Sequence, residues 1–279
     1  MKLYESATLK AFLARHGITA TKGLGQHFLC AQRPVESIAN ALAGCLGVCE
    51  IGPGPGVLTA PLSEQCDRLI ALELDQRMID ALIESAPRAD VRKADALTVN
   101  LDSILAELPE PRGVVSNLPY YITGPLLTKI AESRKSFSIA VLMMQKEVAQ
   151  RVNARPGNSD RGSLSVYLQS QFEIVVVAQV AASEFVPPPK VDSTVLSFVP
   201  KDLALDPDLH GAFFRLVRFG FTQPRKTLAN NLVAAYKQPR ENLVEILEAI
   251  GLEEKVRPHD LTLEQWILLC QSMSLNLAT

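Results

Sequence analysis

A glycine-rich turn follows the first strongly apolar run of the chain. Residues 50–56 read Glu-Ile-Gly-Pro-Gly-Pro-Gly. The first two belong to a predicted strand at residues 48–51, and the glycine turn that follows leads into a predicted helix. Glycines at such a turn allow a ligand to approach the backbone closely. The spacing is not G-x-G-x-x-G, and the two prolines remove N–H donors, so the turn is a poor cradle for a diphosphate. A ligand without a diphosphate fits Gly52 and Gly54 better.

Two carboxylates follow at the ends of the next two predicted strands. Glu73 lies just past residues 69–72, where a carboxylate can accept both hydroxyls of a ribose. Asp95 ends the third predicted strand, where a carboxylate can accept from an adenine amino group. Either acid alone is as typical of the solvent-facing rim of any α/β sheet as it is of a cofactor site. The ordered trio of glycine turn, Glu73 and Asp95 indicates an adenosine-containing cofactor without a diphosphate, and we therefore predict S-adenosylmethionine.

The fourth predicted strand ends in Asn117-Leu118-Pro119-Tyr120. The N6 nitrogen of adenine is a weak nucleophile because its lone pair is delocalised into the ring. The Asn117 side-chain oxygen and the Leu118 carbonyl can accept hydrogen bonds from its two N–H groups and favour a more tetrahedral nitrogen. Pro119 fixes the direction of the Leu118 carbonyl. Tyr120 can stack on the base. The alternative interpretation of Asn-x-Pro is a simple turn. In strand order after the other three features, it indicates methylation of an exocyclic amino group.

The elements that must position these residues follow a βαβ rhythm. Apolar runs at residues 48–51, 69–72, 91–92, 114–115 and 139–143 each predict a buried parallel strand. Two further runs, at residues 174–178 and 194–199, are separated by a proline-rich loop and predict an antiparallel pair that finishes the sheet. We therefore predict an α/β fold with the Rossmann-like sheet of class I S-adenosylmethionine-dependent methyltransferases, in which ligands bind at the carboxyl ends of the strands.

Helices are predicted between the strands and throughout the last part of the chain. Met78, Ile79, Leu82 and Ile83 have the spacing of one helix face. Beyond the connector at residues 201–207, all predicted elements are helical. We expect a methyltransferase domain at residues 1–200, including an N-terminal arm at residues 1–33, and a helical domain at residues 201–279, whose basic residues within 213–240 predict RNA binding. Its predicted helices span residues 209–219, 224–236 with Pro224 at the first helical position, 240–250, and 262–272.

Composition and charge exclude several classes of protein. The chain has 279 residues, of which 47% are hydrophobic and 21% charged, which excludes disordered and collagen-like proteins. The spacing of the five cysteines is not that of a metal site, and their odd number indicates a reduced compartment. The sequence shows no apolar leader and no membrane-spanning run, so we expect a cytoplasmic location without a metal or membrane contact. The formal net charge of −2 conceals an asymmetry, because residues 1–33 and 213–240 carry eleven Lys and Arg against Glu5 alone. These two segments are the expected contacts for RNA phosphates.

The chain resembles the bacterial small-subunit rRNA adenine N6,N6-dimethyltransferase family, which is related to the Erm-type methyltransferases. The resemblance covers almost the whole length, with many motifs in order. They are residues 22–29 (Lys-Gly-Leu-Gly-Gln-His-Phe-Leu), 50–59, 73–75, Asp95, 117–120, 185–193 (Phe-Val-Pro-Pro-Pro-Lys-Val-Asp-Ser), 221–228 and 230–232.

The resemblance implies a role for each motif residue. His27 and Leu29 would touch the cofactor, Gly52 would lie against its methionine portion, Glu73 on its ribose and Asp95 on its adenine. Asn117 would lie at the junction with the target base, and Phe185 would cover that base from the face opposite Tyr120. Without the resemblance, Phe185 is more typical of a core or loop-packing aromatic.

Two positions depart from the family pattern, which usually has Asn where this chain has His27 and Arg where it has Pro224. An imidazole can still donate at one nitrogen and accept at the other, so we expect His27 to keep its contact, and it can add a pH dependence.

The resemblance also implies the reaction and its setting. It indicates S-adenosylmethionine-dependent dimethylation of two adjacent adenosines in a 3′-terminal hairpin loop of 16S rRNA, in the small ribosomal subunit or its precursor, by a monomer. Three alternatives differ in class: a ribosome-assembly factor in which methylation is secondary, a DNA N6-adenine methyltransferase, and a nicotinamide dehydrogenase, which the glycine spacing disfavours.

Overall fold

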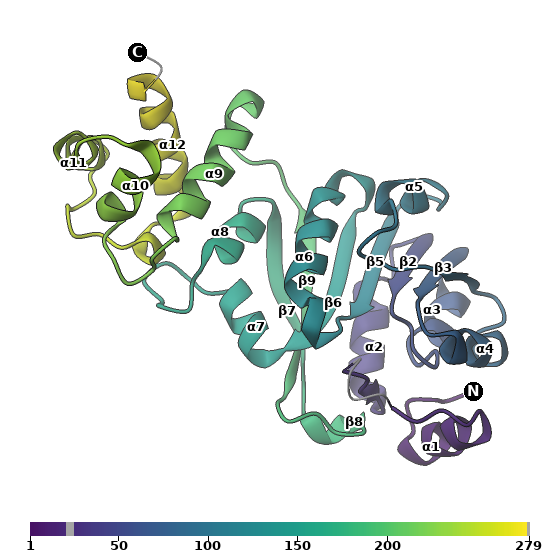
Figure 1. Ribbon diagram of the computed structural model, residues 1–279. Helices are drawn as coiled ribbons and strands as arrows, with labels where there is room; N and C mark the ends of the chain where they lie inside the picture. The colour runs from purple at the N-terminus through teal and green to yellow at the C-terminus, as the bar shows by residue number, and fades with distance from the viewer. Residues whose placement is uncertain (21–24, 278–279) are drawn as a thin grey trace. The chain divides into compact units, whose positions relative to one another are not determined.

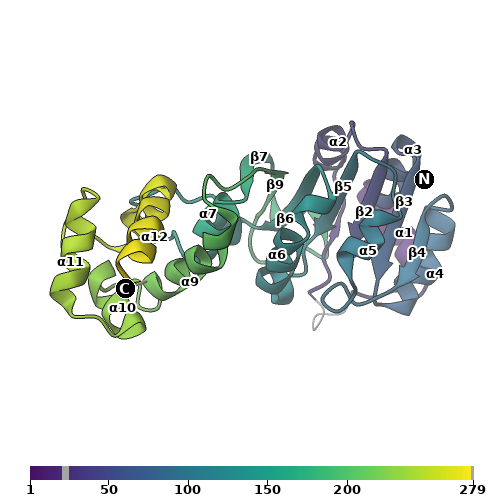
Figure 2. The same cartoon turned by 90° about the horizontal axis from the view of Figure 1, so that it is seen from above.

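The computed structural model describes residues 1–20 and 25–277, which form two compact units. The first unit comprises Met1–Ala149 and Glu173–Pro200, and the second comprises Gln150–Phe172 and the chain from Lys201 onward. Figures 1 and 2 show the strands of the first unit and the helices of the second. Within the described residues, no helix combines the length and apolarity needed to cross a membrane. The expected domain at residues 1–200 thus differs from the first unit, which does not contain residues 150–172.

A seven-stranded sheet forms the centre of the first unit, in the order β4-β3-β2-β5-β6-β9-β7. The strands β4, β3, β2, β5 and β6 run parallel to one another, as predicted from the apolar runs. The bounds are β2 Gly47–Ile51, β3 Arg68–Glu73, β4 Asp90–Lys93, β5 Arg112–Asn117, β6 Ile139–Gln145, β7 Phe172–Val180 and β9 Ser193–Pro200. The predicted fold class is confirmed.

The register of the parallel strands brings the predicted site residues to one edge of the sheet. Ile51 at the end of β2 pairs with Leu72 of β3 and with Ser116 of β5. On the other side of β3, Glu73 pairs with Lys93 at the end of β4. The residues that follow these strands therefore lie together at their carboxyl ends, where open α/β sheets bind ligands.

The sheet finishes with the predicted antiparallel strands. β9 runs antiparallel to β6, with Leu142 opposite Leu196. Its other neighbour is β7, and side-chain hydrogen bonds join Thr194 to Gln179 and Ser197 to the Val175 carbonyl, in the order expected of antiparallel strands. A second sheet was not predicted: β1 (Phe28–Leu29) pairs antiparallel with β8 (Phe185–Val186) and ties the N-terminal arm to the loop before β9.

Helices of the first unit connect and cover the strands. In α4, Met78 and Leu82 are buried as predicted, but Ile83 is 66% exposed. Ile83 lies about 100° around the helix from Leu82 and therefore points away from the buried face. The bounds are α1 Ser6–Arg15, α2 Gln32–Ala41, α3 Thr59–Gln65, α4 Gln76–Ser85, α5 Leu101–Ala106, α6 Thr123–Glu132 and, running across the unit boundary, α7 Lys146–Val152.

The second unit is helical and has its own core. Its helices are α8 Ser163–Gln169, α9 His210–Gly220, α10 Leu228–Tyr236, α11 Arg240–Ala249 and α12 Leu263–Leu277. Residues 150–172 belong here because Val166 of α8 joins the core formed around Trp266, and Tyr167 packs edge-on against Phe214 of α9 at 4.8 Å between ring centroids. This packing explains the difference from the expected domain boundary.

The start of α10 corrects one sequence prediction. Pro224 does not open the helix, because Thr227 is the N-cap and its hydroxyl accepts from the Asn230 N–H. Residues before Thr227 form a turn held by Asn231, whose side-chain oxygen accepts from the Gln223 N–H at 2.8 Å. The cap and the turn move the helix start four residues beyond the predicted position.

Candidate active site

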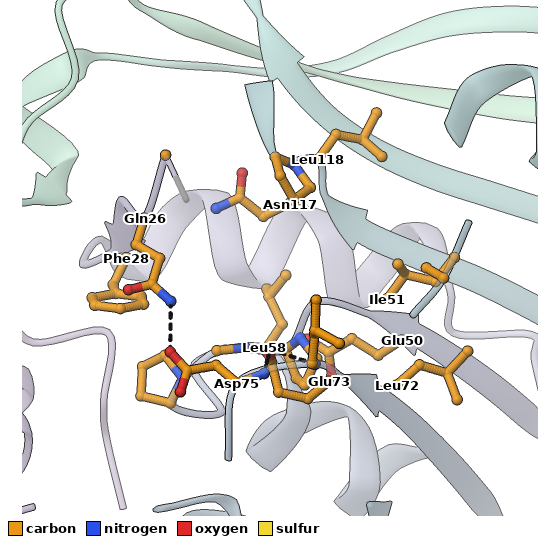
Figure 3. Close-up of a pocket in the computed structure, with 18 of the residues that line it drawn as sticks. Gln26, Phe28, Glu50, Ile51, Leu58, Leu72, Glu73, Asp75, Asn117 and Leu118 are labelled. Atoms are coloured by element: carbon orange, nitrogen blue, oxygen red, sulfur yellow. Dashed lines mark hydrogen bonds between the residues drawn. The ribbon is translucent and has the colours of Figure 1, made fainter. Parts of the chain in front are cut away.

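A cavity of about 560 Å³ lies at the carboxyl ends of β2, β3, β4 and β5 (Figure 3). Its walls consist of residues 25–29, 50–55, 57–58, 72–75, 77, 94–96, 117–120 and 122. Of the ten site residues predicted from the sequence, nine line this cavity: His27, Leu29, Gly52, Gly54, Glu73, Asp95, Asn117, Leu118 and Tyr120. The tenth, Phe185, does not. Residues 22–24 of the first motif lie outside the described part of the chain.

The glycine turn needs two of its glycines for different reasons. Gly52 has φ +67°, and a Cβ built there would meet no atom within 4 Å, so open space lies beside its backbone. Gly56 has φ +94°, and a Cβ there would collide with the Ser85 hydroxyl of α4. The turn thus leaves room for a ligand at Gly52 and packs tightly against the protein at Gly56.

Glu73 is fixed at the end of β3 by three backbone N–H groups. Its Oε1 accepts from Leu74 at 2.8 Å and from Asp75 at 2.9 Å, and its Oε2 accepts from Gly54 at 3.1 Å. Burial raises the pKa of Glu73, and the three N–H groups oppose that rise. An ionised carboxylate has about four acceptor sites, so Glu73 keeps capacity to accept from a ligand hydroxyl.

Four further polar residues shape the same wall, and an individual role was predicted only for Asp95. Asp95 Oδ1 accepts from the Leu97 N–H at 2.9 Å, which orients the side chain. Gln26 Nε2 donates to Asp75 Oδ2 at 3.2 Å and links the N-terminal segment to the end of β3 (Figure 3). The Arg77 side chain donates to Asp75 Oδ1 at 3.0 Å, and this hydrogen bond is the main reason that the pKa of Asp75 is lowered.

The side-chain amide of Asn117 is oriented by the N-terminal segment. Its Nδ2 donates to the His27 carbonyl at 3.2 Å, so its Oδ1 remains available as an acceptor. The next residue, Leu118, donates its N–H to the Met143 carbonyl at 2.9 Å, which fixes the peptide immediately before the other predicted acceptor, the Leu118 carbonyl. Two acceptors in adjacent residues at a strand end are the arrangement required to hold an amino group.

His27 and Tyr120 form a stacked pair at the cavity. Their ring centroids are 5.7 Å apart, with an interplanar angle of 27°. His27 Nδ1 donates to the Pro187 carbonyl at 2.7 Å, which leaves Nε2 as an acceptor in the neutral ring. The Tyr120 hydroxyl lies 3.4 Å from Ser193 Oγ. Contacts from distant segments therefore fix both rings.

Phe185 occupies a different place from the one expected. It is 2% exposed, belongs to the core of the first unit and lies opposite Leu29 in the β1·β8 pair. It supports the cavity through Leu29, which does line it. The expectation that the Phe185 ring covers the target base is not met by this arrangement.

Glu50 was not predicted as a site residue, although it belongs to the segment at residues 50–56 that contains the glycine turn. It lines the cavity, is 2% exposed, and its Oε2 has no hydrogen-bond partner among the described residues. A charged residue at the end of an otherwise apolar strand is the only sequence signal that could have singled it out.

The residues present fit an adenosine-containing cofactor. The open space beside Gly52 admits a ligand close to the backbone, while Glu73 and Asp95 provide acceptors for hydroxyl and amino groups. Comparison with known proteins decides the family. The model of the ribosomal RNA adenine dimethylases matches residues 17–274. The chain belongs to the ribosomal RNA adenine dimethylase family.

Relatives within this family match along nearly their whole length. The ribosomal RNA small subunit methyltransferase A of Geobacillus thermodenitrificans is 35% identical over 278 residues, which cover 95% of this chain and 94% of the relative. The protein of the same name from Streptococcus pneumoniae is 35% identical over 285 residues, covering 98% of each chain.

Solved structures agree with the fold. A dimethyladenosine transferase from Plasmodium falciparum has a TM-score of 0.74 at 27% identity and covers 89% of this chain and 98% of its own. The 23S rRNA methyltransferase ErmE has a TM-score of 0.69 at 26% identity and covers 88% and 99%. This dimethylase uses S-adenosylmethionine, as its sequence predicted.

Proposed function

We propose that this dimethylase transfers two methyl groups in succession to N6 of each of two adjacent adenosines in the 3′-terminal hairpin loop of 16S rRNA, in the small subunit or its precursor. The observation that carries the proposal is the orientation of Asn117. Its Nδ2 is held by the His27 carbonyl, so its oxygen and the Leu118 carbonyl form a pair of acceptors at the cavity wall.

The cofactor contacts are part of the same proposal. Glu73 would hold the ribose and Asp95 the adenine of S-adenosylmethionine, while Gly52 and Gly54 would let the methionine portion approach the backbone. When bound, the cofactor supplies an electrophilic methyl carbon. His27 and Leu29 would close the cavity from the N-terminal segment, which β1 and β8 hold in place.

The acceptor pair would activate the amino group by geometry. When the Asn117 and Leu118 oxygens accept the two N–H groups, the nitrogen lone pair is turned out of the ring plane and toward the methyl group. Alignment for an in-line displacement then contributes more than proton abstraction. After the first transfer one N–H remains, so a single acceptor must hold the bulkier amine for the second.

Tyr120 would stack on the target base. Its ring is already fixed against His27, so little side-chain entropy is lost when a base binds. A hairpin-loop adenosine is partly unstacked, and its entry into the cavity therefore costs less than flipping a base from a duplex.

The basic segments at residues 1–33 and 213–240 would contact rRNA phosphates. We expect affinity for small subunits to fall steeply with salt, because each phosphate contact releases counterions. A flat dependence on salt would contradict this assignment. The proposed setting is the cytoplasm and the proposed state a monomer.

The acceptor distinguishes this function from its alternatives. Small subunits that lack the modification are expected to accept labelled methyl groups, whereas naked DNA is not; preferential methylation of DNA would favour the DNA methyltransferase. An assembly factor would still support subunit maturation in cells that carry only the Asn117→Ala protein, so growth of those cells separates assembly from catalysis.

A further inference from the structure

Glu50 is a buried carboxyl group whose presence the proposed contacts do not explain. It lies within β2, paired with Ala71 of β3 and Val115 of β5, so its own strand neighbours supply no charge. Its side chain is 2% exposed and Oε2 has no hydrogen-bond partner within residues 1–20 and 25–277, yet the residue lines the cavity (Figure 3). A buried acceptor without a partner carries a free-energy cost that a bound ligand can offset.

The charged groups around the cavity are mostly acidic. Glu73 and Asp75 come from the end of β3, Asp95 from the end of β4, Arg77 from the start of α4, and the titratable His27 from the N-terminal segment. Arg77 is engaged by Asp75. Glu73 acts on Glu50 through its charge, and the buried Thr59 hydroxyl of α3 faces Glu50 from the helix that follows the turn.

The surroundings of Glu50 disfavour its charged form. Burial raises the pKa of Glu50 to about 8; the Thr59 hydroxyl opposes this rise and the Glu73 carboxylate adds to it. At neutral pH the side chain therefore carries a proton, and only a cation that enters the cavity compensates for the loss of that proton.

We propose that Glu50 holds a proton before the cofactor binds and releases it when cationic S-adenosylmethionine enters the cavity. In this step the carboxyl O–H bond breaks, the proton passes to the solvent and no electrons are exchanged. The product S-adenosylhomocysteine has a neutral thioether in place of the sulfonium, so it favours the release less. Glu50 thereby makes the cavity discriminate in favour of the methyl donor over the product.

This inference rests on the proposed cofactor contacts near Gly52, two residues after Glu50. It predicts that affinity for S-adenosylmethionine rises about tenfold per pH unit below pH 8 and levels off above it, in addition to any titration of the ligand's own amino group. The dependence has this sign because the carboxylate is the form that binds and the proton must leave.

Titration calorimetry in two buffers of different ionisation enthalpy counts the protons released on binding. With S-adenosylmethionine at pH 7, the wild-type protein is expected to release close to one proton more than Glu50→Gln, and at pH 9.5 the difference is expected to vanish. The amide keeps the size of the neutral acid, and retained binding of S-adenosylhomocysteine shows that the variant is folded. Glu64→Gln changes an exposed side chain of α3 that pairs with Arg88; it is the matched control and should release as many protons as the wild type.

Equal proton counts in wild type and Glu50→Gln at pH 7 would overturn the inference, as would an equal difference with S-adenosylhomocysteine. The ratio of the two ligands' affinities is expected to fall about tenfold or more in Glu50→Gln. Cofactor binding without the proton difference counts against Glu50 alone, whereas cofactor binding without methylated adenosine counts against the proposed function.

Discussion

Replacement of Asn117 by alanine removes the side chain that links the N-terminal segment to the proposed target base. In the structure it makes one hydrogen bond, from Nδ2 to the His27 carbonyl at 3.2 Å. That bond contributes about 0.5–1.5 kcal/mol net, so we expect affinity for S-adenosylmethionine to fall about tenfold or less and the fold to persist.

The effect on transfer is expected to be larger. Loss of one oriented hydrogen-bonding group that acts mainly in the transition state typically costs about 10²–10³ in kcat. Asn117→Ala leaves only the Leu118 carbonyl to accept from the amino group, and we therefore expect a loss of this size, which approaches abolition of activity in a routine assay.

The assay is single-turnover methyl transfer to small subunits that lack the modification, with cofactor affinity measured in parallel. Asn100→Ala is the matched control: Asn100 caps α5, its Oδ1 accepts from the Ser103 N–H at 3.0 Å, and it lies outside the cavity wall. We expect that variant to lose about 1 kcal/mol of stability and no activity. Near-native transfer by Asn117→Ala would refute the role given to the acceptor pair.

Three other perturbations test separate parts of the account. Tyr120→Ala should weaken binding of the rRNA acceptor by about 1–3 kcal/mol and cofactor binding much less; equal losses would argue against stacking. Gly56→Ala should lower the free energy of unfolding in urea by about 2–5 kcal/mol, since its φ of +94° and the crowding at its Cβ both disfavour a side chain. Arg92 lowers the pKa values of Asp90 and Glu107, so stability should decrease as pH falls below about 4, and Arg92→Met should flatten that decrease in urea titrations at several pH values.

Local sequence patterns were sufficient to predict the sheet. Each apolar run became a strand, and the parallel register brought residues after Ile51, Leu72 and Ser116 to one edge. This worked because strands buried on both faces have continuous apolar sequences, and because ligands bind α/β sheets at a defined end.

Features that depend on contacts between distant segments were not predictable in this way. The β1·β8 pair joins residues more than 150 positions apart, and neither two-residue strand has a sequence signal of its own. Likewise, residues 150–172 belong to the second unit through contacts such as those of Val166 and Tyr167 with its helices. For α10, the cap at Thr227 prevailed over the general preference for proline at a helix start.

The sequence predicts which residues form the site better than it predicts the contacts that those residues make. Glu73 and Asn117 reach the cavity because each ends a strand, and Asp95 does so because it lies two residues after β4. The burial of Phe185 depends on its pairing with Leu29, which the linear pattern does not show. Glu50 carries no spacing signal either, and only its burial without a partner distinguishes it.

The most direct test of the central claim is to map the adenosines that acquire label. Small subunits lacking the modification are incubated with the protein and methyl-labelled S-adenosylmethionine, and the rRNA is then digested and sequenced. We predict N6,N6-dimethyladenosine at two adjacent positions of the 3′-terminal hairpin loop of 16S rRNA, with Asn117→Ala giving none above background. Label at other positions, or on an atom other than N6, would contradict the account.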